Sequence, residues 1–215
     1  MAKLDPRALD VYVVTTGTLV SGRAHGEIAT AAIEGGATAV QLRAPELDDQ
    51  RLLPLAAAIA RMCGDAGVLF LVDDRVDVAV TAQAAGAHVG QRDDPGGARA
   101  RLGPERILGV SVGSIEEAER AEGLGADYLG VTVWSTSTKP EAEPIGLEGV
   151  RRIVDATHLP VVGIGGIDPT NARSVLEAGA AGVAVISSVA AADDPAEAVR
   201  ELRGAVEAFY EERGR

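Results

Sequence analysis

Short apolar runs rich in Val, Ile and Leu alternate along the chain with longer amphipathic stretches rich in Ala, Glu and Arg. A strand buried on both faces is uniformly apolar, and a helix packed on it is apolar on one side, so this alternation is typical of parallel βα units. Eight runs predict strands, each followed by a helix: Val11–Thr15, Ala39–Arg43, Leu69–Asp73, His88–Gln91, Ile107–Val112, Tyr128–Val133, Val161–Ile164 and Gly182–Ser187.

Local signals at the ends of these elements support the division. A Gly-Ala pair stands before the second, fourth, sixth and eighth strands, beginning at positions 36, 86, 125 and 179. Ser114 followed by Glu117 predicts a capping box, in which each residue satisfies a backbone N–H of the other. Asp168 before Pro169 predicts an N-cap with a first-turn proline, and Pro195 predicts the start of the last helix.

The number of units predicts the architecture. Eight βα units in 215 residues give about 27 residues per unit, which fits a compact (β/α)8 barrel. An open doubly wound sheet, the alternative, more often stops at five or six strands. We therefore predict the α/β class and a single TIM-barrel domain over residues 1–215. The longest irregular stretch, Ser135–Pro144, is of a length more often functional than idle.

Charge and cysteine content narrow the classes of partner. Acidic residues outnumber basic ones by 32 to 20, which gives a net charge of −12. A field of this sign disfavours nucleic acid and anionic membranes. Cys63 is the single cysteine, which excludes an intrachain disulfide and fits a reducing compartment. No apolar run reaches the roughly 18 residues of a membrane span. We expect a cytoplasmic protein, and the sequence leaves open whether it forms a homo-oligomer.

Two carboxylates stand where a barrel carries its chemistry. Barrel active sites lie at the carboxyl ends of the strands, and Asp74 and Asp93 follow the third and fourth strands. Mg²⁺ is usually held by one or two carboxylates together with water and substrate phosphate, so the pair is a candidate magnesium site. The alternative is that each aspartate caps a helix or pairs with Arg75 or Arg92.

Other polar residues at the strand ends are candidates for binding phosphate. The glycine-rich run Gly163–Ile167 and Ser187 follow strands seven and eight, the usual phosphate site of a barrel, although a Gly-Gly pair also suits a plain tight turn. Thr136, Thr138 and Lys139 offer two hydroxyls and an ammonium for closing over phosphate oxygens. The alternative for these three residues is a solvated polar loop.

The end of the second strand carries two further candidates for substrate binding, and the three histidines carry none. Arg43 points a cation into the predicted mouth, and the Gln41 amide suits the edge of a heterocycle. His25, His88 and His158 form no metal or triad pattern, and we expect each to be structural or on the surface. His88 is expected at the start of its strand, at the bottom of the barrel.

Seven motifs, each at a strand end, together resemble the thiamine phosphate synthase superfamily, which also contains thiazole tautomerases. The resemblance covers nearly the full length of the chain. The motifs are QLR at 41–43, DDR at 73–75, HVGQRD at 88–93, GVS at 109–111, TSTK at 136–139, GIGGI at 163–167 and VIS at 185–187.

The resemblance implies a barrel enzyme that joins a hydroxymethylpyrimidine diphosphate to a thiazole phosphate and releases pyrophosphate. It implies that the magnesium ligands are Asp74 and Asp93. It implies that catalysis and diphosphate binding fall to Arg43, Ser111 and Lys139, and that Gln41 contacts the aminopyrimidine. Asp73 is expected among the substrate-binding residues. The thiazole phosphate would be held by Thr136, Thr138, the backbone of Gly166, Ile186 and Ser187.

Two positions differ from the usual family pattern, because Pro45 stands where lysine is usual and Asp73 where asparagine is usual. These differences leave open a paralogue that binds a thiazole phosphate without catalysis. A thiazole tautomerase is the other alternative, but that branch is expected to carry a histidine shortly after strand five, and this chain has Ser-Val-Gly-Ser at 111–114.

Overall fold

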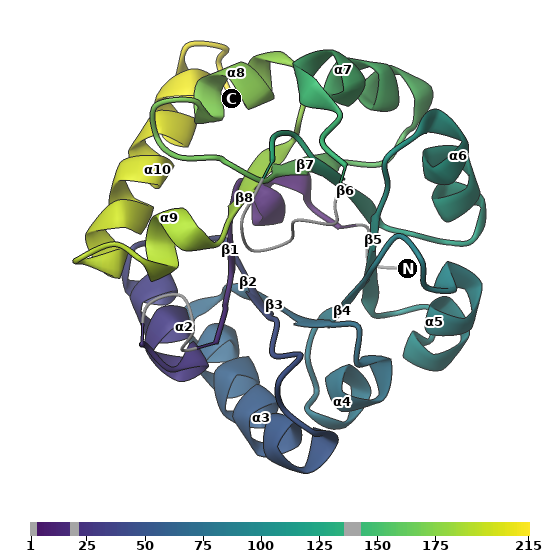
Figure 1. The fold of residues 1–215 in the computed structure, drawn as a ribbon, viewed down its shortest axis with the longest axis vertical. Coiled ribbons are helices and arrows are strands. Elements are labelled where there is room, and N and C mark those ends of the chain that lie inside the picture. Colours follow the sequence, from purple (N-terminus) through teal and green to yellow (C-terminus); the bar gives the residue numbers. More distant parts are fainter. Residues whose placement is uncertain (1–3, 18–21, 136–142) are drawn as a thin grey trace.

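Eight parallel strands form a closed barrel in the computed structural model, which describes residues 4–17, 22–135 and 143–215 (Figure 1). The strands follow one another around the barrel in chain order, and β1 pairs with β8. They are β1 (Val11–Val14), β2 (Ala39–Leu42), β3 (Leu69–Asp73), β4 (Gly86–Val89), β5 (Ile107–Ser111), β6 (Tyr128–Thr132), β7 (Val161–Ile164) and β8 (Gly182–Val185). The prediction of a TIM barrel is confirmed.

A helix follows every strand on the outside of the barrel, as predicted. A short 3₁₀ helix, η1 (Pro6–Leu9), precedes β1. The others are α2 (His25–Glu34), α3 (Asp49–Ala66), α4 (Val76–Thr81), α5 (Pro95–Leu102), α6 (Ile115–Gly123), α7 (Gly146–Ala156), α8 (Ala172–Glu177), α9 (Ser187–Ala190) and α10 (Pro195–Glu211). Across the described parts of the chain, none of these helices has both the length and the apolarity needed to cross a membrane.

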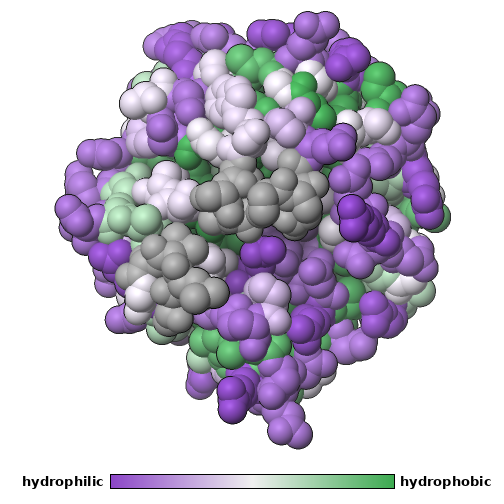
Figure 2. All heavy atoms as spheres, in the orientation of Figure 1, coloured by the Kyte–Doolittle hydropathy of each residue, from purple (hydrophilic) through white to green (hydrophobic). Residues whose placement is uncertain are grey.

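The strand pleat separates two apolar clusters. Alternate side chains such as Val11 and Val13 point outward and pack with the helices in one large cluster. Their neighbours Tyr12 and Val14 point inward and belong to a smaller cluster inside the barrel, with Leu71 and others. Hydrophilic side chains predominate on the outer rim of the face seen in Figure 2. The inner cluster is small, and this leaves room for polar groups at one end of the barrel.

The predicted helix starts are confirmed for α10 and in part for α6. Pro195 opens α10. The Ser114 hydroxyl accepts from the Glu117 N–H at 3.2 Å, as a cap should. The Glu117 carboxylate, however, accepts from the N–H of Gly113 at 2.7 Å and from the side-chain amide of Gln91. Glu117 therefore ties the loop after β4 to the loop after β5.

The predicted start of α8 is wrong. The helix begins at Ala172, and Asn171 occupies the N-cap position. Asp168 instead accepts from the backbone and hydroxyl of Thr170 in a turn before the helix. Aspartate stabilises a turn of this kind as readily as a helix start, so the dipeptide signal alone could not separate the two.

The predicted bounds of the fourth strand are also wrong, because β4 begins two residues earlier, at Gly86. A Cβ atom on Gly86 would lie 1.9 Å from the carbonyl oxygen of Ile107, so glycine is required for close approach to β5. The Gly-Ala pair at 86 is therefore part of the strand and not a turn before it. The shift moves His88 from the bottom of the barrel to the wall of its cavity.

Candidate functional site

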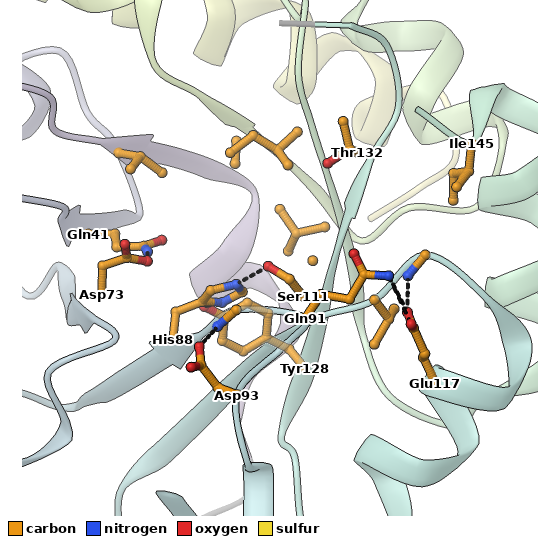
Figure 3. Close-up of a pocket in the computed structure, with 18 of the residues that line it drawn as sticks. Gln41, Asp73, His88, Gln91, Asp93, Ser111, Glu117, Tyr128, Thr132 and Ile145 are labelled. Carbon is orange, nitrogen blue, oxygen red and sulfur yellow. Dashed lines mark hydrogen bonds between the residues drawn. The ribbon is translucent and has the colours of Figure 1, made fainter. Parts of the chain in front are cut away.

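A cavity of about 770 Å³ opens at the carboxyl ends of the strands, where barrel active sites lie. Side chains of all eight strands or of the loops after them line it (Figure 3). The predicted site residues on this wall are Gln41, Arg43, Asp73, Asp93, Ser111 and Ile186. Thr136, Thr138 and Lys139 lie outside the described residues.

Asp73 draws two of the predicted residues together. One carboxylate oxygen of Asp73 accepts from the side-chain amide of Gln41, and the other lies 3.4 Å from the Nε atom of Arg43. Side chains of Arg43 and Asp73 are 24% and 16% exposed, so water screens this pair less than a surface ion pair. Arg43, one of two arginines among the described residues that line the cavity, is therefore already paired with an acidic residue.

The wall opposite Ile186 carries polar groups that the sequence reasoning did not select. His88 Nε2 lies 2.9 Å from the hydroxyl of Ser111, and His88 Nδ1 lies 2.9 Å from the hydroxyl of Tyr128. Tyr128 in turn lies 2.9 Å from the hydroxyl of Tyr12, which donates to Gln41. Burial raises the pKa of both phenols well above the usual value, so both remain neutral.

Tyr12, His88 and Tyr128 were missed because none of them was expected at the carboxyl end of a strand. A tyrosine or histidine at the start or in the middle of a strand is more often part of a core than of a site. The signal that could have found them is the alternation along β4 and β6, which turns His88, Tyr128 and Gly130 to the inside. Gly130 lies close beside the His88 ring, because a Cβ atom there would be 3.0 Å from it.

The two candidate metal ligands flank one glycine. A Cβ atom on Gly90 would lie 3.0 Å from an oxygen of Asp93 and 3.9 Å from an oxygen of Asp74. Asp93 accepts from the N–H of Gly90 at 2.7 Å, while the cap of α5 is Asp94. Arg75 pairs with Asp49. The structure thus does not favour the alternative in which Asp93 caps a helix.

These two aspartates fit Mg²⁺ as a shared ion of protein and substrate. Their donors are carboxylate oxygens, which Mg²⁺ prefers, and Mg²⁺ commonly takes its remaining ligands from water and phosphate. Within the described residues, no group of three or more His, Cys, Asp or Glu side chains is placed to hold a metal by itself. Substrate and water would supply the further ligands of such an ion.

A second, smaller pocket of about 40 Å³ lies between the ends of β7 and β8 and shares Thr132 and Ile164 with the large cavity. The predicted residues Gly166, Ile186 and Ser187 line it. Gly166 has a φ of 66°, in the left-handed region that favours glycine. The side-chain amide of Asn171 donates to the Gly166 carbonyl at 2.8 Å and fixes this loop.

Ser188 adds a residue that the sequence reasoning missed at this pocket. Its hydroxyl oxygen is buried and has no hydrogen-bond partner among the described residues. A buried hydroxyl without a partner costs about 1–3 kcal/mol, which a bound oxygen could remove. Ser188 lines the small pocket beside Ser187, so the pocket has an unsatisfied group where an anion would sit.

His25 belongs to a polar cluster beside the site, as a structural residue. It is buried at the start of α2 and lies 2.8 Å from the hydroxyl of Thr15 and 2.7 Å from the carboxylate of Glu46. Thr15 also accepts from the backbone N–H of Arg43 at 3.3 Å. The cluster links the loops after β1 and β2, next to the guanidinium of Arg43.

Known proteins are similar to this chain in both sequence and fold. Residues 11–189 match the family model described as thiamine monophosphate synthase. A thiamine-phosphate synthase of Moorella thermoacetica is 52% identical over 200 residues, which span 92% of this chain and 95% of that protein. One from a Roseiflexus species is 46% identical over 95% of this chain and 88% of its own length. The solved thiamine phosphate pyrophosphorylase of Pyrococcus furiosus is 41% identical with a TM-score of 0.87, covering 95% of this chain and 98% of that one.

Proposed function

The chain belongs to the thiamine monophosphate synthase family and has thiamine-phosphate synthase activity, and on this premise we propose which parts of its cavity serve which substrate. The observation that supports the assignment is the separation of two polar regions. The aspartates flanking Gly90 follow β3 and β4, and the small pocket lies at β7 and β8. These two pairs of strands lie on opposite sides of the barrel (Figure 1).

The pyrimidine diphosphate is assigned to the side of β2 to β5. Gln41 and Asp73 would contact the aminopyrimidine, and Arg43 and Ser111 would meet the diphosphate end of this substrate. Asp74 and Asp93 would hold Mg²⁺, which when bound supplies positive charge to the leaving diphosphate. Lys139, outside the described residues, is proposed as a further diphosphate contact.

The thiazole phosphate is assigned to the small pocket. Its phosphate would take the backbone N–H groups around Gly166 and Ser187 and the unpartnered hydroxyl of Ser188. Thr136 and Thr138 are proposed as further contacts. Ile186 lines both cavities, so the thiazole ring would lie against it with its nitrogen toward the pyrimidine.

The chain needs no nucleophile for this reaction. The bond between the pyrimidine methylene carbon and the diphosphate oxygen breaks, and the electron pair leaves with the diphosphate. The pyrimidine ring stabilises the resulting cation, and the thiazole nitrogen then forms the new C–N bond. The protein contributes charge neutralisation and alignment of the two rings, which suffice where no covalent intermediate forms on a side chain.

The proposal is tested by incubating the purified protein with both substrates and Mg²⁺. We expect thiamine phosphate and pyrophosphate in equal amounts, measured by chromatography. Absence of product, with thiazole phosphate still bound in calorimetry, would identify a binding paralogue. Isomerisation of a thiazole phosphate carboxylate without coupling would identify a tautomerase. A cytoplasmic location stays a prediction, and the oligomeric state is left open by the sequence.

A further inference from the structure

Seven side chains form one continuous series of polar contacts around the inside of the barrel. Figure 3 shows five of them, from Gln41 and Asp73 on one side to His88, Tyr128 and Ser111 on the other. The series runs through Arg43, Asp73, Gln41, Tyr12, Tyr128, His88 and Ser111. Each side chain between the two ends, Arg43 and Ser111, contacts the one before it and the one after it. The position of every shared proton is therefore linked to the next.

The carboxylate of Asp73 determines the orientation of the Gln41 side-chain amide. An ionised carboxylate can only accept hydrogen bonds, so the Gln41 amide has to turn its nitrogen toward Asp73. Its oxygen then faces Tyr12, at 2.7 Å. An amide oxygen can only accept, so the single phenolic proton of Tyr12 is committed to Gln41.

The two tyrosines carry this direction across the barrel. The Tyr12 hydroxyl donates its hydrogen bond to Gln41, so the donor in the 2.9 Å contact between the two phenols has to be Tyr128. Both phenols are buried and their pKa values are raised, mainly by burial, so neither ionises to break the series. The Tyr128 oxygen is then left as an acceptor.

These contacts determine which ring nitrogen of His88 carries the proton. The contact between the Tyr128 oxygen and His88 Nδ1 is 2.9 Å, and its proton has to reside on Nδ1. A neutral imidazole carries one proton, so Nε2 is unprotonated and accepts from the hydroxyl of Ser111 at 2.9 Å. Ser111 therefore turns lone pairs, and not its proton, toward the cavity.

We propose that Asp73 is a positioning residue which, through Gln41 and the two tyrosines, holds His88 in the Nδ1-protonated form and makes Ser111 a hydrogen-bond acceptor in the cavity. Such an acceptor suits an N–H of the aminopyrimidine and not a diphosphate oxygen, which can only accept. This part of the inference rests on the proposed function and replaces the diphosphate contact proposed there for Ser111. The position of the histidine proton does not depend on any substrate.

An asparagine at position 73 would reverse the series. Arg43 Nε can only donate, so the single side-chain oxygen of asparagine would face Arg43 and its NH₂ group would face Gln41. Gln41 would then flip, and its nitrogen would donate to Tyr12. Each remaining hydrogen bond of the series would reverse its direction, so that His88 carries its proton on Nε2 and donates to Ser111.

The test is nitrogen-15 NMR of the histidine rings in the ligand-free protein at about pH 8, above the usual histidine pKa of about 6.5. A protonated ring nitrogen and an unprotonated one have widely separated shifts. We expect His88 to show protonated Nδ1 and unprotonated Nε2 in the wild type. In Asp73→Asn the two shifts should exchange.

Two controls distinguish an effect transmitted through the series of polar contacts from an effect of removing the charge of Asp73. Tyr12→Phe breaks the series but keeps Asp73, so Tyr12→Phe and the double variant Tyr12→Phe with Asp73→Asn should give the same His88 shifts. Asp77→Asn removes a charge from an exposed residue of α4 and should leave His88 as in the wild type. His25 is an internal reference, because its Nε2 faces the acceptor Glu46 and should stay protonated throughout.

A wild-type His88 protonated on Nε2 would overturn the proposal without any variant, as would His88 shifts that are the same in the wild type and in folded Asp73→Asn. Exchange of the shifts in Asp73→Asn even when Tyr12 is Phe would also overturn it, because the influence of Asp73 would then bypass the series. Since no substrate is present, each of these outcomes is distinct from failure of the coupling reaction.

Discussion

Among Arg43, Asp73, Asp74 and Asp93, on the side assigned to the diphosphate, three carboxylates outnumber one guanidinium, and that guanidinium is already paired with Asp73 at 3.4 Å. These four residues offer an anionic leaving group little free positive charge, and Arg92 is a further cation on the cavity wall. Mg²⁺ would therefore supply a larger share of the neutralisation here than in a site with an additional lysine at position 45. The substitution of Pro45 for that lysine is thus a reason to expect strong metal dependence.

Substitution of a metal ligand should affect one substrate only. Asp93→Asn keeps an oxygen that can accept from the Gly90 N–H but removes the charge. Lewis-acid stabilisation is worth several kcal/mol, so we expect kcat/KM for the diphosphate to fall at least about 100-fold. The affinity for thiazole phosphate should stay within about twofold, because that pocket lies across the barrel.

The neighbouring Asp94 provides the matched control. It caps α5 by accepting from the N–H of Gly96, so Asp94→Ala should lose about 1 kcal/mol of stability while turnover persists. Steady-state kinetics over a magnesium series and calorimetry with thiazole phosphate measure both variants. Equal loss of both substrates in Asp93→Asn would show that the metal assignment is wrong.

At the scale of elements, the alternation of apolar and amphipathic runs was sufficient to predict every strand of the barrel and the helix after it. It also located Gln41, Arg43, Asp73 and Ser111, because they lie at strand ends. It could not place the start of β4, since the need for Gly86 arises from the Ile107 carbonyl, a contact made through space. Tyr12, His88 and Tyr128 were missed because none of them stands at the carboxyl end of its predicted strand.

The close approach of β4 and β5 can be measured. Gly86→Ala would place a methyl group 1.9 Å from the Ile107 carbonyl oxygen, and neither strand can move without disturbing its other neighbour. We expect a loss of at least about 3 kcal/mol in the free energy of unfolding, or failure to fold. Denaturation in urea gives the value.

Gly64→Ala is the contrasting variant. Gly64 lies within α3, and nothing is within 4 Å of a Cβ atom placed there. Alanine should therefore raise stability by about 0.5–1 kcal/mol through its higher helix propensity. Similar urea midpoints for the two alanine variants would contradict the crowding assigned to Gly86.

At the scale of the whole molecule, the net charge is −12, and none of the Asp, Glu, Lys and Arg residues that the structure describes is fully buried. The interior instead holds three weakly acidic side chains that stay neutral. Burial raises the pKa of the Cys63 thiol to about 12. Tyr12 and Tyr128 are shifted upward for the same reason. Unfolding would expose all three groups to water, where each ionises at lower pH.

The folded protein should therefore lose stability in mild alkali. An unfolded cysteine ionises near pH 8.5, whereas folded Cys63 keeps its proton up to about pH 12. Between these values the unfolded state binds fewer protons, so stability falls as pH rises, by up to about 1.4 kcal/mol per pH unit. Below about pH 8 the thiol is protonated in both the folded and the unfolded state, so it does not contribute to the pH dependence of stability.

Urea midpoints at a series of pH values between about 8 and 9 measure this slope, below the range in which most of the exposed tyrosine ionises. In Cys63→Ala the slope over this range should largely disappear, even though the cavity left by the sulfur lowers stability at every pH. An unchanged slope in that variant would assign the alkaline loss to other groups.

The pairing of β1 with β8 has a consequence for synthesis on the ribosome. Val11 lies opposite Val183, so the first strand waits for nearly the whole polypeptide before its second edge is covered. Until then the nascent sheet exposes unpaired backbone groups, to which another nascent chain could add a strand. The small pocket between β7 and β8 would form at the same late moment. A stalled translation product that lacks β8 would therefore be prone to aggregate and would lack the pocket assigned to the thiazole phosphate.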